Sequence, residues 1–436
     1  MPRWKVGLRA LQSRNFQLFF SGQLISLIGT WMQTIAESWL VYRLTGSALL
    51  LGSVGFAAQI PVFLFAPLGG IVADRANRQR VVIATQTAAM ILALTFATLT
   101  LTHRIRVPYI FVLAALLGIV NAFDIPARQA FLIDMVGREN LMNAIALNSS
   151  MFNGARIVGP AIAGILVAKI GEGWCFFANG LSYTAVITGL LLMQIQCVRR
   201  PKSDSPVADI IEGFRFAMSA KPIRALLLLL GLVSLVAMPY TVLMPVFADR
   251  ILHGGARGLG LLMGATGVGA LAGALTLAFR QGVRGLGRLV AWMCGMFGVS
   301  LFLFAMSRKF WLSVLLLIPV GFAMMLEMAS SNTLIQSMVP DALRGRVMAL
   351  YSMMFMGMAP FGAFFGGAMA NRFGAPLTVQ VGAAASLVGA LWFWRSLPSF
   401  RYEARQMIIA QAVAGGEPPE EMTTPVNPNE TPVSLS

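Results

Sequence analysis

Four charged residues stand within apolar stretches of this sequence, and their types limit the chemistry that they could perform. Asp124 and Arg128 belong to NAFDIPARQAF, which follows the apolar run PYIFVLAALLGIV. Arg156 and Glu327 lie in apolar surroundings of their own. A charged side chain inside a bilayer is costly and usually marks a path for ions, protons or substrate. We therefore expect ion pairing, proton binding or charged-ligand binding here, and no covalent catalysis.

Depth along the expected helices indicates a partner for Asp124. At about 1.5 Å per residue, Asp124 lies roughly 15 Å, Arg128 roughly 9 Å and Arg156 roughly 22 Å above one membrane interface. Arg156 is then within reach of Asp124 on the neighbouring helix. We predict an Asp124–Arg156 ion pair, with Arg128, one helical turn away, as a competing partner. Asn121 shares the helix face of Asp124 and Arg128.

An internal repeat relates Asp124 to Glu327. The segment that begins at Val136 aligns without a gap with the segment that begins at Val339, a shift of 203 positions that pairs Asp124 with Glu327. The same shift places uncharged residues, Ser331 among them, opposite both arginines. Two carboxylates therefore occupy equivalent positions in two repeats, but only the first has basic residues nearby.

Glu327 is the leading candidate for proton coupling or for contact with a cationic substrate. A carboxyl group in an apolar helix without a cation is expected to favour its neutral, proton-bound form. Asp124, which has arginines in reach, is more suitable as a structural or gating ion. The alternative for Glu327 is a permanently hydrogen-bonded residue, satisfied by Ser330, Ser331 or water, with no coupling role.

A polar stripe follows the first apolar segment at steps of three and four residues. Such a stripe must face protein or water instead of lipid. It would line a substrate cavity, although polar packing between helices gives the same pattern. The stripe comprises Gln23, Ser26, Thr30, Gln33 and Glu37, with the last expected near the outer mouth.

The elements that position these residues are membrane helices. Of the 436 residues, 57% are hydrophobic and 11% are charged, and the mean hydropathy is +0.74. Apolar runs of about 20 residues recur, each long enough to cross about 30 Å of hydrocarbon. We expect an all-α integral membrane protein with twelve transmembrane helices in two six-helix halves. The expected helices cover residues 15–42, 47–73, 80–102, 108–134, 141–168, 173–196, 223–250, 257–280, 287–307, 310–337, 346–371 and 375–396.

Charge and cysteine patterns narrow the possible partners. Most of the 33 lysines and arginines fall on the side of the helices that holds both termini, which the positive-inside rule places in the cytoplasm. The net charge of +16 then suits membrane lipids with anionic headgroups, and no nucleic acid is needed to explain it. The cysteines are far apart and no phosphate-loop motif occurs, so we expect no metal, no cofactor and no enzyme activity.

The chain divides into four expected parts. Residues 1–196 form the N-terminal six-helix half and 223–400 the C-terminal six-helix half. Residues 197–222 form a cytoplasmic linker, and 401–436 a largely disordered cytoplasmic tail. The linker should hold a short amphipathic helix, either on the membrane surface or packed on the protein, because of the spacing of Ile210, Ile211, Phe214 and Met218.

Several motifs resemble those of the major facilitator superfamily. The stretch GGIVADRANRQR is similar to the loop motif of that superfamily, with Asn77 where the family usually has glycine. Further similar stretches are RNFQLFFSGQLISLIGTWMQ, WLVYRLTGS, FDIPARQAF and ALNSSMFNGARIVGPAIAG, which resemble the transmembrane secretion effector branch, a group that includes enterobactin exporters and macrolide efflux proteins. The residues that match the loop motif are Gly70, Asp74, Arg75 and Arg78.

This resemblance implies alternating access, commonly driven by proton exchange. Asp74 would meet the positive N-terminal end of helix 11 near Arg346, while Arg75 and Arg78 would link that contact to carboxylates and headgroups. Breaking this contact on inward opening would make a two-state latch. In helix 5, close helix approach and a bend are expected at Gly154, Gly159, Pro160 and Gly164.

The function that these observations favour is secondary active export of an amphipathic small molecule, siderophore-like or drug-like, by proton antiport. We expect a monomer in a bacterial plasma (inner) membrane with both termini in the cytoplasm. One alternative is a lysolipid or lipid transporter of the same fold. Another is a non-transporting membrane sensor, which would bind a ligand without concentrative flux.

Overall fold

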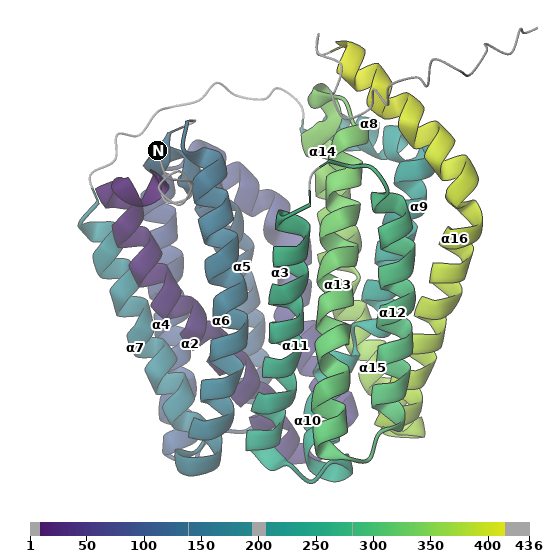
Figure 1. Cartoon of the computed structure of the whole chain (residues 1–436). Helices are drawn as coiled ribbons and strands as arrows, with labels where there is room; N and C mark the ends of the chain where they lie inside the picture. The colour runs from purple at the N-terminus through teal and green to yellow at the C-terminus, as the bar shows by residue number, and fades with distance from the viewer. Residues whose placement is uncertain (1–8, 138, 194–205, 281, 415–436) are drawn as a thin grey trace, which may run out of the picture.

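The computed structural model describes residues 9–137, 139–193, 206–280 and 282–414, and in these ranges the chain is helical with short turns. Figure 1 shows the helices standing side by side as a bundle with two parts, coloured purple to teal and green to yellow. Eleven helices of the described chain are long and apolar enough to cross a membrane. The expected all-α integral membrane fold is therefore confirmed.

The N-terminal half consists of a short 3₁₀ turn and six long helices. The first long helix, with 32 residues, falls outside the group of eleven because it carries the polar stripe. Short polar caps begin several of these helices, as where the Ser47 hydroxyl accepts a hydrogen bond from the Leu50 N–H. The elements are η1 (Arg9–Gln12), α2 (Arg14–Thr45), α3 (Ala48–Arg75), α4 (Arg78–Leu101), α5 (Val107–Val136), α6 (Leu141–Ile170) and α7 (Glu172–Leu191).

The C-terminal half follows the linker helix α8 (Pro206–Ser219), which covers the residues whose spacing predicted a short helix. Two of its membrane-length rods are composite. The first joins α9 (Lys221–Leu232), η2 (Val233–Ala237), α10 (Tyr240–Val246) and η3 (Phe247–Ile251), and the second joins α14 (Asp341–Ser352), η4 (Met353–Gly357) and α15 (Ala359–Phe373). The others are α11 (Gly255–Ala278), α12 (Leu286–Met306), α13 (Phe310–Met338) and α16 (Ala375–Ala414).

Two differences from the predicted helices concern this second half. The rods expected at 223–250 and 346–371 contain π-helical segments, at η2 and η3 in the first and at η4 in the second. The last helix, expected to end at residue 396, continues to Ala414. Residues 401–414, expected in the largely disordered tail, are thus helical. This extension packs on the protein through the buried Phe400 and Ala404, and Glu403 pairs with Lys221 at 3.2 Å.

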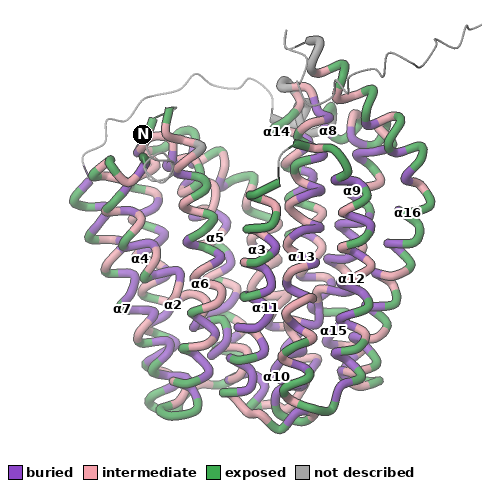
Figure 2. Tube along the Cα trace, in the orientation of Figure 1, coloured by how far each residue is buried: buried purple, intermediate pink, exposed green. Residues whose placement is uncertain are grey.

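The bundle has two ends, which hold different parts of the chain. The N-terminal face holds the start of α2, the linker helix α8 and the end of α16, and the other end is the opposite face (Figure 1). Buried residues lie between the helices and exposed ones follow their outer sides (Figure 2). Large apolar side chains such as Leu64, Ile91 and Val388 are exposed, as expected for helices whose outer surface faces lipid.

Candidate functional site

Asp124, on α5, is the centre of a hydrogen-bonded group built from α4 and α5. Its side chain is buried, and Oδ1 accepts hydrogen bonds from Thr85 Oγ1 at 2.8 Å and from Gln86 Nε2 at 2.9 Å. Oδ2 lies 3.3 Å from Nε of Arg128, one turn along the same helix. The structure places Asn121 half-buried on this helix, outside the group. The charge and lone pairs of Asp124 are thus satisfied within the N-terminal half.

The predicted Asp124–Arg156 ion pair is wrong, and the competing partner Arg128 takes its place. The Arg156 guanidinium carbon lies 5.7 Å from the ring centroid of Trp31 on α2 and within electrostatic range of Tyr240 on α10. In the part of the chain that the structure describes, no carboxylate lies within ion-pair distance of Arg156. The prediction failed because counting residues fixes height along a helix but not direction around its axis.

Glu327, on α13, has very different surroundings from Asp124. The residue is 1% exposed, and its Oε2 has no hydrogen-bond partner among the described residues. The Ser330 hydroxyl, one of the groups expected to satisfy it, is buried and equally without a partner there. Tyr351, a near neighbour, donates its hydroxyl hydrogen to the Met328 carbonyl at 2.9 Å. A network like that of Asp124 is therefore missing around Glu327 within the described ranges.

In the polar stripe of α2, one side chain hydrogen-bonds to a neighbouring helix and another has a buried oxygen without a partner among the described residues. Gln33 Oε1 accepts a hydrogen bond at 2.6 Å from Nδ2 of Asn179 on α7, which is the packing alternative that the sequence left open. Gln23 Oε1, in contrast, is buried without a partner among the described residues. In exposure, the stripe consists of the buried Gln23, Ser26 and Gln33 and the half-buried Thr30 and Glu37.

Arg78, in the loop motif, joins the ends of three helices at the N-terminal face. Its Nη1 pairs with Asp134 on α5 at 2.9 Å, and its Nε donates to the Ala73 carbonyl on α3 at 3.0 Å. Asn77 caps α4 by accepting the Arg80 N–H, with φ at −68°. The position where the family usually has glycine therefore needs no left-handed backbone here.

Asp74, which is expected to reach across to helix 11, does not do so in this structure. Its side chain is 77% exposed, and its ion pair is with Arg78 of its own half at 3.4 Å. Arg346, at the start of the expected helix 11, pairs with Glu212 of the linker helix α8. The Asp74 contact with helix 11 thus stays a prediction for a state closed at this face. The other motif residues lie at the same end, where an added side chain at Gly70 would meet open space and Arg75 is exposed.

Toward the opposite face, the two halves touch backbone to backbone. A Cβ atom on Gly52 of α3 would lie 2.2 Å from the Ala363 carbonyl oxygen of α15. A Cβ atom on Gly260 of α11 would lie 2.6 Å from the Pro160 carbonyl oxygen of α6. Only glycine allows such approach. The halves are therefore joined in this part of the bundle, while Asp74 at the other end is exposed and is paired with Arg78 of its own half.

The glycines expected to allow close approach in helix 5 behave differently from one another. A Cβ atom on Gly159 would lie 2.5 Å from Cβ of Trp31, and one on Gly164 would lie 2.9 Å from Cα of Gly260. Gly154 has open space around it. The helix α6 runs from Leu141 to Ile170 with Pro160 inside it.

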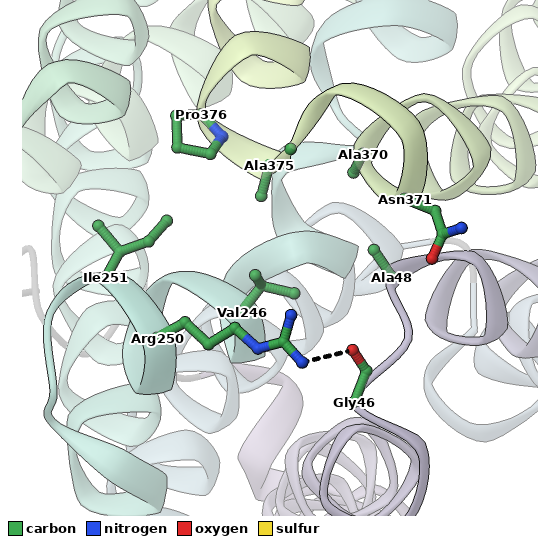
Figure 3. A pocket seen from close by; sticks show the side chains of 10 residues that line it. Gly46, Ala48, Val246, Arg250, Ile251, Ala370, Asn371, Ala375 and Pro376 are labelled. Carbon is green, nitrogen blue, oxygen red and sulfur yellow. Dashed lines mark hydrogen bonds between the residues drawn. The ribbon is translucent and has the colours of Figure 1, made fainter.

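Polar contacts at the opposite face, missed from sequence, also link the halves. Tyr42 Oη of α2 donates to Asp249 Oδ2 of η3 at 3.3 Å, and Arg250 Nη2 donates to the Gly46 carbonyl at 3.0 Å (Figure 3). Arg250 borders a pocket of about 240 Å³ that Asn371 also lines. The sequence signal was the pair of adjacent opposite charges at the end of the expected helix 223–250, which gave no indication of its partners.

The π-helical segments η2 and η4 meet inside the C-terminal half. Ser234 Oγ of η2 donates to the Phe355 carbonyl of η4 at 2.5 Å. The equivalent helices of the N-terminal half, α2 and α6, are continuous. Such segments occur often at functional sites.

Comparison with known proteins places this architecture in a family. The model of the transmembrane secretion effector family matches residues 6–435. The chain belongs to this family. It is therefore a major facilitator transporter of small molecules and not an enzyme.

Two relatives and two solved structures are similar over most of the chain. The staphyloferrin A transporter of Staphylococcus aureus (strain NCTC 8325 / PS 47) is 25% identical over 83% of this chain and 91% of its own. The enterobactin exporter EntS of Escherichia coli O1:K1 / APEC is 26% identical over 89% of this chain and 92% of its own.

The nucleoside transporter NupG (D323A mutant) has a TM-score of 0.70 at 16% identity, covering 88% of this chain and 99% of its own. A bacterial homologue of the iron transporter ferroportin has a TM-score of 0.68 at 18% identity, covering 88% and 98%. These structures support the fold.

Proposed function

We propose that this transporter exports an amphipathic organic molecule, siderophore-like or drug-like, in exchange for protons. The observation that carries the proposal is Glu327 of the C-terminal half, a buried carboxyl group with one oxygen that has no hydrogen-bond partner in the described part of the chain. A carboxyl group without a fixed cation can bind and release a proton as its access to water changes. Asp124, its counterpart in the repeat, is already paired with Arg128.

The arrangement of the halves supports alternating access. They contact closely toward the opposite face, at Gly52 and Gly260, while Asp74 at the N-terminal face is exposed. With the N-terminal face in the cytoplasm, as the positive-inside rule predicts, this is an inward-open state. Export would then require the loop motif to close at Asp74 and the glycine contacts to part.

The substrate class is proposed from the names of two relatives. The two relatives named above carry staphyloferrin A and enterobactin in their names, and they match along nearly their whole length. We therefore propose a siderophore-like substrate first and a drug-like one second. The protein is proposed to act as a monomer in a bacterial plasma membrane.

Proton-driven transport into inverted membrane vesicles tests this proposal. Vesicles with an acidified lumen receive a panel of catechol siderophores, macrolides and dyes, together with a lysophospholipid, while a lumenal dye follows pH. Wild-type protein should release lumenal protons when a substrate is added. The Glu327→Gln variant should bind that substrate but release none, because its amide cannot carry the proton.

The matched control is Glu139→Gln, the same chemical change at an exposed carboxylate. It should couple like the wild type. Normal coupling in Glu327→Gln would reject the role of Glu327, and attention would move to Asp124 and Glu37. Proton release driven only by the lysophospholipid would favour the lipid-transporter alternative, and substrate binding with no flux in wild type would favour a sensor.

A further inference from the structure

Arg156 differs in its partners from three other arginines of the helical bundle. Arg43, Arg78 and Arg128 each have a carboxylate partner, at 2.7 Å, 2.9 Å and 3.3 Å respectively. Arg156 has none among the described residues, although it lies midway along α6, which runs from residue 141 to 170. A cation at that depth without a counter-ion is costly, so a role in binding is the default expectation.

The protein holds the Arg156 guanidinium in a defined direction. Its central carbon lies 5.7 Å from the Trp31 ring centroid, a cation–π contact. Trp31 is itself fixed by packing, because Gly159 lets α6 approach it closely and the Phe152 ring lies 5.6 Å away. An aromatic face orients the arginine without neutralising its charge, so the guanidinium hydrogens remain available for an acceptor.

A second unused donor comes from the other half of the molecule. Tyr240 of α10 is 1% exposed, and its hydroxyl lies near Thr266 of α11 but makes no hydrogen bond of normal geometry to any described residue. The ring packs against Phe297, with centroids 6.2 Å apart, and the hydroxyl lies within electrostatic range of Arg156. A buried hydroxyl without a partner is unfavourable unless something binds to it.

The two donors lie where the halves meet. A Cβ atom on Gly267 of α11 would be 3.1 Å from the Arg156 carbonyl oxygen, so α6 and α11 are in contact at this residue. A ligand that accepts hydrogen bonds from Arg156 and Tyr240 would touch both halves at once. Its binding free energy would then differ between arrangements of the two halves. Alternating access requires such a difference, because a ligand shifts an equilibrium only by binding one state more tightly than the other.

We propose that Arg156, Trp31 and Tyr240 form a subsite that binds a carboxylate group carried by the organic substrate. Arginine has a planar fork that matches two oxygens of such a group, and the tyrosine hydroxyl supplies a further donor. The subsite rests on the proposed export function for its role in transport, but binding of the anion can be measured without flux. It assigns the substrate a negative charge that Glu327 could not recognise.

The experiment uses two pairs of small probes with the full-length protein in lipid nanodiscs. The pairs are 2,3-dihydroxybenzoate with 2,3-dihydroxybenzamide, and citrate with trimethyl citrate. Binding is followed by calorimetry and by thermal stabilisation near neutral pH. Wild-type protein should bind the anion of at least one pair about tenfold more tightly than its neutral counterpart, because charge-assisted hydrogen bonds are lost in the neutral one.

Substitutions then locate the preference. Arg156→Gln should remove it, Arg156→Lys should restore part of it, and Tyr240→Phe should weaken anion binding a few-fold with neutral binding unchanged. Lys169→Gln, which removes a positive charge from the exposed end of the same helix, should bind both probes like the wild type.

Two outcomes would overturn the subsite. One is that wild-type protein prefers neither anion over its neutral counterpart. This result is obtained with wild-type protein alone and does not depend on the folding of any variant. The other is a preference that survives Arg156→Gln in protein that elutes as a single species. Failure of proton-coupled flux, with the anion preference intact, would reject the export proposal and leave the subsite standing.

Discussion

Asp124 and Glu327 occupy equivalent positions in the two halves, but the protein treats the two carboxyl groups in opposite ways. Asp124 receives hydrogen bonds from Thr85 and Gln86 and pairs with Arg128. Glu327 is as deeply buried and has an oxygen without a partner among the described residues. The two repeats thus have a carboxyl group at the same position but differ in the hydrogen-bond and ion-pair partners around it.

The difference extends to the helices around each acid. The N-terminal half consists of continuous helices tied together by Arg78 and the Asp124 group. The C-terminal half contains the π-helical segments η2 and η4, which bond to each other through Ser234. The N-terminal half therefore combines a partnered carboxyl group with continuous helices. The C-terminal half combines a carboxyl group that has an unpartnered oxygen among the described residues with helices interrupted by π-helical segments.

The largest effect on stability is expected when the fixed charge is removed. Asp124→Asn leaves Arg128 beside a neutral group and should lower the free energy of unfolding by about 2–3 kcal/mol, less than for a fully buried pair because Arg128 is partly exposed. Glu327→Gln, the matched change in the other half, should leave stability unchanged or raise it, since no fixed partner is lost. Denaturation in mild detergent measures both. Equal losses would break the comparison.

Making the first half resemble the second is the next test. The repeat places Ser331 opposite Arg128, so Arg128→Ser gives the first half the residue type that the second half has at that position. Thr85 and Gln86 remain, and the loss should be about 1–2 kcal/mol. Arg104→Ser, at an exposed loop arginine, is the control and should have no effect. If Arg128→Ser is equally harmless, the ion pair adds nothing to the hydroxyl and amide donors.

Much of the fold could be predicted from the sequence because membrane helices are encoded by composition alone. Apolar runs gave most helix positions to within a few residues. The π-helical segments could not be predicted, since they depend on contacts such as that of Ser234 with a carbonyl more than a hundred residues away. The end of α16 was missed because no long apolar run marks the extension, which packs through single residues such as Phe400 and Ala404.

The candidate site was predictable in part. The repeat identified Asp124 and Glu327 as equivalent, and the structure places both in the interior. The partner of Asp124 was wrong because sequence gives depth along a helix but not the direction that a side chain faces. Trp31 and Tyr240 were missed for a related reason, since aromatic residues in an apolar helix carry no signal until their neighbours are known.

A smaller effect is expected from the bond between the π-helical segments. Ser234→Ala removes the hydroxyl that donates to the Phe355 carbonyl and should lower the free energy of unfolding by about 1 kcal/mol. Ser300→Ala, at another buried serine of the same half, provides the comparison. If irregularity in this half serves movement, Ser234→Ala should also change the transport rate, whereas a purely structural bond would change only stability.

The smallest effect should come from a contact between the halves. Tyr42→Phe removes the hydroxyl that donates to Asp249 at 3.3 Å, and we expect a loss of about 0.5 kcal/mol because the bond is long and near the surface. The Arg250 bond to the Gly46 carbonyl and the glycine contacts at Gly52 would still hold the opposite face closed. Labelling of a cysteine placed at Ala48, a buried residue that lines the pocket at this face, reports whether the face opens. Much faster labelling in Tyr42→Phe would mean that one hydroxyl determines closure, and the contrast between a fixed and a free acid would then matter less than the contact between the halves.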